Sequence, residues 1–271
     1  MDCRGPSEHA GIVARLVTDD VDAGVMLKQD VMWRPYGYYR TKSNVARFMD
    51  QYGYDAYEEL LPDSEEDIAR LWGEFDRDTG IVWDTDYETV LDTSEGAPFA
   101  RWFGGGELNA TRTLLDQWVD SEPDRTAYHW TGEQGDSESL TYAELAARVG
   151  VFANALRDHG IGSGDAVGIV APLRPEPIVA ALACLKIDAV YTDVFAGYGT
   201  SAIRERLSDC GAELVVTVDG YHRSGEVNEL RAKVDESVAD TDVRTIVTHE
   251  HLGLGTSVEN AKSVSWTEFT A

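Results

Sequence analysis

The chain has 271 residues, of which 43% are hydrophobic, a composition typical of a globular protein with one or two domains. Its charge balance is unusual, because 49 acidic residues stand against 23 basic ones and the formal net charge is −26. Binding to nucleic acid or to an anionic membrane needs a basic surface, so we expect neither as a partner. The acids are dispersed and lysine is scarce, which favours a halophilic protein of a high-salt cytoplasm over a dedicated acidic partner-binding face.

The three cysteines, Cys3, Cys184 and Cys210, are far apart and show neither zinc-ligand spacing nor a disulfide framework. Cys184 lies in an apolar run and is expected to be a small core residue. The first 30 residues lack the apolar core of a signal peptide, and no stretch approaches the roughly 20 apolar residues that span a bilayer. We therefore expect a cytoplasmic location.

Residues 1–95 show no alternation of strand and helix patterns, and from residue 31 onward they are rich in Trp, Tyr and Asp. Ser64, followed by three acids, predicts the N-cap of a helix that runs to about Phe75. The region is therefore expected to be an extension, mostly irregular and helical, that packs on something else. The composition changes near Gly96, which we take as the boundary of the first of two predicted domains.

Residues 96–271 alternate between short apolar strands and amphipathic helices. Strands are expected at residues 128–130, 167–170, 189–195, 214–218 and 245–248, and helices at 108–119, 141–160, 175–185, 201–208 and 227–238. Thr141 and Glu144 have the spacing of a capping box at one helix start. Strands joined by helices of about ten residues imply crossover connections, so the fold class is α/β with a mainly parallel sheet flanked by helices.

Two loops lie where such a sheet binds ligands, beyond the carboxyl ends of its strands. Residues 195–200 and residues 219–225 are both rich in glycine and aromatic side chains. The first loop can offer backbone N–H groups to an anionic or purine ligand, or it is an ordinary turn that uses glycine for positive φ. Arg223 in the second loop can pair with a phosphate, or it is a solvated surface arginine.

Two other patterns point away from a site. Residues 160–165 contain glycines spaced like a dinucleotide fingerprint, but they follow a helix and precede a strand, the reverse of the required order. His249 and His251 can form a metal-binding pair, yet no third ligand accompanies them, so no metal site is expected. No Ser–His–Asp or Cys–His set is evident, and no catalytic residue is predicted.

Several segments, in collinear order, resemble the AMP-forming acetyl-CoA synthetases of the adenylate-forming ligase superfamily. These segments are residues 44–49, 99–109 (FARWFGGGELN), 140–145 (LTYAEL), 152–156, 160–167, 172–176 (PLRPE) and 194–198 (VFAGY). The first resembles the amino-terminal extension of the acetyl and acetoacetyl branch. The ordered set is more specific than any one of its members.

This resemblance implies an acid–CoA ligase that uses ATP with Mg to convert a carboxylate into an acyl-adenylate and pyrophosphate, then transfers the acyl group to CoA. It places Phe195, Ala196 and Gly197 near the CoA adenine and Arg223 near the CoA 3′-phosphate. Glu226 departs from the family pattern, which often has a second basic residue at that position. Thr113, Gln117 and Asp188 also depart from the pattern, the last standing where glycine is usual.

The chain contains no Ser/Thr/Gly-rich loop with lysine that would hold the ATP phosphates. We therefore expect the amino-terminal portion of such a synthetase, cut before that loop, inactive alone, binding at most CoA, and completed by a complementary carboxy-terminal portion. A non-catalytic CoA-binding, nucleotide-binding or interaction module derived from such an enzyme is the alternative. An unrelated nucleotide-binding α/β enzyme is disfavoured, because Rossmann and P-loop fingerprints are missing.

Overall fold

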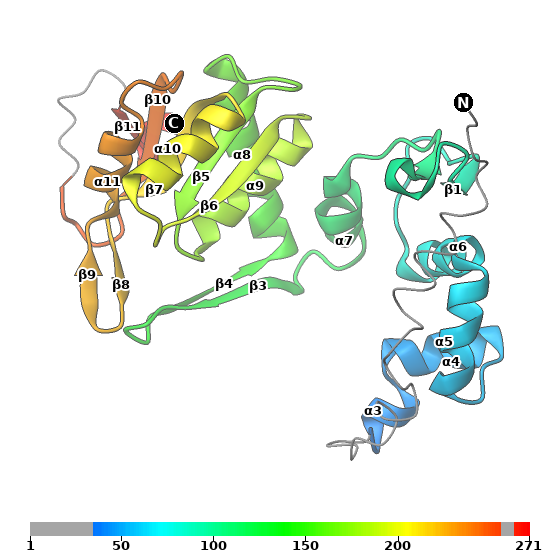
Figure 1. Ribbon diagram of the computed structural model, residues 1–271. Helices are drawn as coiled ribbons and strands as arrows, with labels where there is room; N and C mark the ends of the chain where they lie inside the picture. The colour runs from blue at the N-terminus through cyan, green and yellow to red at the C-terminus, as the bar shows by residue number, and fades with distance from the viewer. Residues whose placement is uncertain (1–34, 256–262) are drawn as a thin grey trace, which may run out of the picture. The chain divides into compact units, whose positions relative to one another are not determined.

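The computed structural model describes residues 35–255 and 263–271, so the first 34 residues of the predicted extension lie outside the described part (Figure 1). Two compact units divide between Ile68 and Ala69. The domain boundary near Gly96, which rests on the change in composition there, is not tested by this division and stays a prediction. None of the described helices is long and apolar enough to cross a membrane.

The first unit is helical in its described residues. It contains α3 (Tyr38–Thr41), α4 (Asn44–Tyr52) and α5 (Tyr57–Glu66), and α6 (Ile68–Thr79) follows. The predicted N-cap at Ser64 is wrong, because Ser64 lies inside α5 and its hydroxyl donates to the Leu61 carbonyl at 2.6 Å. The helix has already begun at Tyr57, where Glu58 and Glu59 occupy the favourable first turn.

In the second unit, which begins within α6, several short elements follow this helix and precede the main sheet. They are the antiparallel pair β1 (Thr89–Asp92) and β2 (Arg101–Gly104), the 3-10 turn η1 (Ala97–Phe99), the π-helical segment η2 (Arg112–Asp116) and α7 (Gln117–Ser121). The rings of Trp83, Tyr87 and Phe103 pack together here, with centroids 5.1 to 5.6 Å apart. The predicted helix 108–119 is present as η2 and α7, with one wide turn that the sequence pattern does not reveal.

A five-stranded parallel sheet with the order β11-β10-β7-β5-β6 forms the centre of this unit (Figure 1). Its strands are β5 (Ala166–Ala171), β6 (Val190–Phe195), β7 (Ala212–Val218), β10 (Thr245–His249) and β11 (Ser263–Ser265). The predicted mainly parallel sheet is confirmed. The pattern had not indicated β11 or the following α12 (Trp266–Phe269), because both are only three or four residues long.

Helices cover both faces of the sheet and create two apolar cores. One core contains α8 (Tyr142–Asp158) and α9 (Pro175–Lys186), and the other contains α10 (Thr200–Asp209) and α11 (Leu230–Ser237). Alternate residues of β5 enter different cores, Ile169 the first and Val170 the second. Cys184 is fully buried in the first core, as predicted, and the capping box of Thr141 and Glu144 starts α8.

Two antiparallel hairpins lie outside the main sheet. They are formed by β3 (Thr126–Thr131) with β4 (Ser137–Thr141), and by β8 (Tyr221–Arg223) with β9 (Glu226–Asn228). The predicted helix start at residue 227 is wrong, because β9 occupies that segment and α11 begins at Leu230. Ser224 and Gly225 both have left-handed φ, 56° and 80°, which is the geometry of a two-residue hairpin turn.

Candidate functional site

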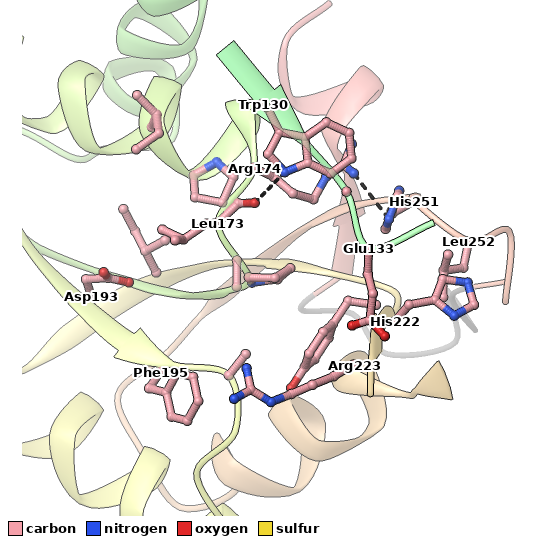
Figure 2. Close-up of a pocket in the computed structure, with 18 of the residues that line it drawn as sticks. Trp130, Glu133, Leu173, Arg174, Asp193, Phe195, His222, Arg223, His251 and Leu252 are labelled. Carbon is pink, nitrogen blue, oxygen red and sulfur yellow. Dashed lines mark hydrogen bonds between the residues drawn. The ribbon is translucent and has the colours of Figure 1, made fainter. Parts of the chain in front are cut away.

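A cavity of about 980 Å³ lies at the carboxyl ends of β5, β6 and β7 (Figure 2). The connection after β5 leads to α9 on one face of the sheet, whereas the connections after β6 and β7 lead to α10 and α11 on the other. Neighbouring strands β5 and β7 therefore send their loops in opposite directions, and this divergence opens a crevice where α/β sheets bind ligands.

The two loops predicted from sequence both contribute to this cavity. Phe195, Ala196 and Arg223 line it. The Cζ atom of Arg223 lies 5.4 Å from the centre of the Phe195 ring, and Figure 2 shows the guanidinium reaching toward that ring. The structure thus brings together three of the four predicted site residues from different strand ends.

Gly197, the fourth predicted residue, is not among the residues that line the cavity, but its lack of a side chain leaves room for the Phe195 ring. A Cβ atom at position 197 would lie 2.4 Å from the ring, closer than real Cβ contacts allow. The Phe195 ring meets Tyr198 edge to face at 5.5 Å between centroids. Glycine at this position therefore permits the ring to fold back over its own loop.

The tip of the β8–β9 hairpin is tied to the turn of the β3–β4 hairpin. The Glu133 carboxylate accepts the backbone N–H groups of Ser224 at 3.0 Å and Gly225 at 2.6 Å. This contact fixes the strand end that carries Arg223. Glu226 lies directly across the hairpin from Arg223, so the departure noted in the sequence puts a carboxylate on the neighbouring strand.

The opposite wall of the cavity contains a buried polar network that the sequence analysis missed. Arg174 is 7% exposed, and its Nε donates to Glu176 at 3.1 Å. Its Cζ lies 4.4 Å from the centre of the Trp130 ring. Nη1 of Arg174 lies 3.2 Å from Nε2 of His251, and because arginine can only donate, this nitrogen accepts and the His251 proton sits on Nδ1 (Figure 2).

His249 and His251 both contact residues at the start of α9. Nε2 of His249 lies 3.3 Å from Glu176. Burial lowers the pKa of His249, although Glu176 acts against this shift. Burial and the nearby Arg174 also lower the pKa of His251. Within residues 35–255 and 263–271, no group of three His, Cys, Asp or Glu side chains is placed to hold a metal.

Asp219 organises the loop that carries His251. The side chain is 2% exposed and accepts backbone N–H groups from Gly220, His251, Leu252 and Leu254 at 2.8 to 3.1 Å. Burial acts to raise the pKa of Asp219, but these hydrogen bonds outweigh it and the pKa is lowered. An aspartate directly after a buried strand was the signal that could have identified it.

Comparison with known proteins shows which family the chain resembles. A family model described as "AMP-binding enzyme" matches residues 115–268, more than half of the chain, and one described as "Acetyl-coenzyme A synthetase N-terminus" matches residues 57–113. The chain is 40% identical over 213 residues to an acetyl-coenzyme A synthetase of Mycolicibacterium smegmatis, covering 78% of this chain and 22% of that protein. An acetyl-coenzyme A synthetase of Pasteurella multocida is 32% identical over 248 residues, covering 91% and 37%.

A solved structure shows the same fold. Acetoacetyl-CoA synthetase from Streptomyces lividans superposes with a TM-score of 0.80 at 24% identity, and the match covers 90% of this chain and 38% of that one. The chain therefore spans well under half the length of the relatives that it matches.

Proposed function

This chain belongs to the AMP-binding enzyme family, and from that premise we propose that it is the CoA-binding portion of an AMP-forming acyl-CoA synthetase. The observation that carries the proposal is the contact between the Arg223 guanidinium and the Phe195 ring, both of which line the cavity. An aromatic ring stacks on a purine, and a guanidinium pairs with a phosphate. CoA carries both groups, an adenine and a 3′-phosphate on its ribose.

We further propose that these 271 residues alone do not form an acyl-adenylate. That step releases pyrophosphate from ATP and needs preorganised donors around the phosphates to stabilise the developing charge. The sequence offers no Ser/Thr/Gly-rich loop with lysine for this purpose. The chain would contribute the CoA side of the second half-reaction, in which the acyl group is transferred.

A complementary carboxy-terminal portion of a synthetase is the proposed partner. Strand β6 is the edge of the described sheet, and its side chains Val190 and Tyr191 are 51% and 38% exposed. An open edge with apolar side chains is suited to pairing with a further strand. The remaining part of a synthetase would supply that strand together with the ATP-binding residues.

Titration of the 271-residue chain with CoA and with dephospho-CoA tests the binding proposal. We expect CoA to bind more tightly, and we expect Arg223→Gln to abolish the difference. The matched control is Arg148→Gln, which removes the same charge from an exposed ion pair with Glu138. Equal binding of the two ligands by the unmodified chain would contradict the assignment of Arg223.

A second assay addresses catalysis. We expect no acetate-dependent release of pyrophosphate from ATP and Mg by the chain alone, and release after addition of the carboxy-terminal portion of a related synthetase. Release of pyrophosphate by the chain alone would refute the proposal that these 271 residues do not form an acyl-adenylate. CoA binding without restored activity would favour the alternative function, a non-catalytic CoA-binding module.

A further inference from the structure

A second arginine lies on the far side of the aromatic pair that contains Phe195. The Cζ atom of Arg206, on α10, is 4.4 Å from the centre of the Tyr198 ring. Tyr198 meets Phe195 edge to face, and Arg223 lies over Phe195. Two guanidinium groups from separate elements therefore flank one pair of aromatic rings, and all four side chains line the cavity.

Neither of these two arginines forms an ion pair within the part of the chain that the structure describes. Eight of the 15 arginines in the described residues form an ion pair with a carboxylate, and one of them is Arg174 in the same cavity, which is paired with Glu176. No ion pair between described residues involves Arg206 or Arg223. Nη1 of Arg206 donates to the Ala202 carbonyl at 3.0 Å, which leaves its other N–H groups available to a ligand.

The remaining charges of the cavity show where an anion can bind. Glu133, Asp136 and Asp193 also line it, so its overall character is not basic. The carboxylate of Glu133 is already occupied by the backbone N–H groups of the hairpin tip. Of the three arginines that line the cavity, the two at the ends of the aromatic pair are therefore the ones outside any ion pair with a described residue, which favours a ligand with two separate anionic groups.

We infer that Arg206 binds the 5′-diphosphate of the nucleotide whose 3′-phosphate is held by Arg223. This inference rests on the proposed CoA-binding function. CoA carries a monophosphate and a diphosphate at different positions of one ribose, with an adenine beside them. An adenine against Phe195 and Tyr198 would direct these two anionic groups toward the two arginines. Arg206 then supplies the second cation that the chain lacks at Glu226.

Four variants, measured with CoA and dephospho-CoA, test this inference. They are Arg206→Gln, Arg206→Lys, Arg223→Gln and the charge-matched Arg148→Gln. The loss of one charge-assisted contact is expected to weaken binding about tenfold. Arg206→Gln should therefore lower the affinity for CoA and for dephospho-CoA by the same factor, because both contain the diphosphate. Arg206→Lys should restore part of that affinity. Arg223→Gln should lower the affinity for CoA alone, because dephospho-CoA lacks the 3′-phosphate.

The outcomes separate this inference from the function on which it rests. Failure of the unmodified chain to bind either ligand would overturn both. Binding by the unmodified chain with no change in Arg206→Gln, or a loss confined to CoA, would overturn the role of Arg206 and leave CoA binding intact. Because Arg206 is exposed, its variants should keep the thermal midpoint of the parent chain.

Discussion

Arg223 stacks over the ring of Phe195, with 5.4 Å between its Cζ atom and the ring centre. This contact joins the end of β6 to the β8–β9 hairpin that follows β7, and β5 lies between β6 and β7 in the main sheet. It depends on the ring position that Gly197 permits. The contact therefore offers a test of the site that leaves both participating side chains unaltered.

Substitution of Gly197 by alanine is expected to weaken CoA binding about tenfold, because the Phe195 ring must leave its place and stacking on a base is worth about 1–3 kcal/mol. The ring is half exposed and can move, so the free energy of unfolding should change little. Gly199→Ala is the matched control, since a Cβ atom there meets nothing within 4 Å. Equal CoA affinities for the two variants would contradict the role given to Gly197.

Gly168→Ala should destabilise the fold by about 1–3 kcal/mol through overpacking. A Cβ atom at position 168 would lie 2.3 Å from the fully buried Leu207 side chain and 3.2 Å from Val215. Gly150→Ala, in open space within α8, should instead stabilise by about 0.5–1 kcal/mol. Chemical denaturation measures both changes, and no loss of stability in Gly168→Ala would show that α10 does not pack closely on β5.

Asp188 has a left-handed φ of 63°, a conformation that favours glycine, which is the residue that the family resemblance leads us to expect at this position. Asp188→Val should destabilise by about 1–2 kcal/mol, because left-handed backbone is unfavourable for L-residues and most of all for β-branched ones. Asp188→Asn should be nearly neutral, since asparagine tolerates this conformation. Denaturation midpoints of the two variants provide the comparison, and equal midpoints would argue against a left-handed residue 188.

Stability should fall as the pH drops below about 6.5. Burial lowers the pKa of His249 in the folded chain, so the unfolded chain takes up its proton first and is favoured by acid. His251 acts in the same direction. Each histidine contributes at most about 1.4 kcal/mol per pH unit between its unfolded and folded pKa values. His249→Gln should reduce this slope between pH 6.5 and 5, and an unchanged slope would show that His249 is not the titrating group.

The dispersed negative charge predicts a dependence on salt. Repulsion among the acids is screened over about 10 Å at 0.1 M salt and about 3 Å at 1 M. We therefore expect the thermal midpoint to rise strongly from low salt to molar KCl. Equal midpoints in the two conditions would remove the halophilic interpretation.

Local sequence patterns predicted the main strands because β5, β7 and β10 are short apolar runs that match their sheet positions. They also predicted the capping box, whose signal lies within four residues. The β8–β9 hairpin was missed because three-residue strands carry almost no periodicity. Its Ser224–Gly225 turn was the available signal.

Two loops of the site could be predicted because their glycines and aromatic residues follow strands directly. The contact between Arg174 and His251 could not, because it depends on β7 lying between β5 and β10. The order of strands in a sheet depends on how all the helices pack, so no local sequence pattern predicts it. The CoA contacts of Phe195, Ala196, Gly197 and Arg223 remain predictions that binding measurements can decide.

The strand order also has a consequence for the kinetics of folding. Strand β5 lies between β6 and β7, yet it precedes both of these neighbours along the chain, and β7 reaches it only after β6 and α10 have been made. Its hydrogen bonds therefore close long loops, and topologies dominated by such distant pairings fold slowly. During synthesis we expect β5 to pair with β6 first while its other edge lacks β7, so a nascent chain halted before β7 should bind chaperones through this unpaired edge.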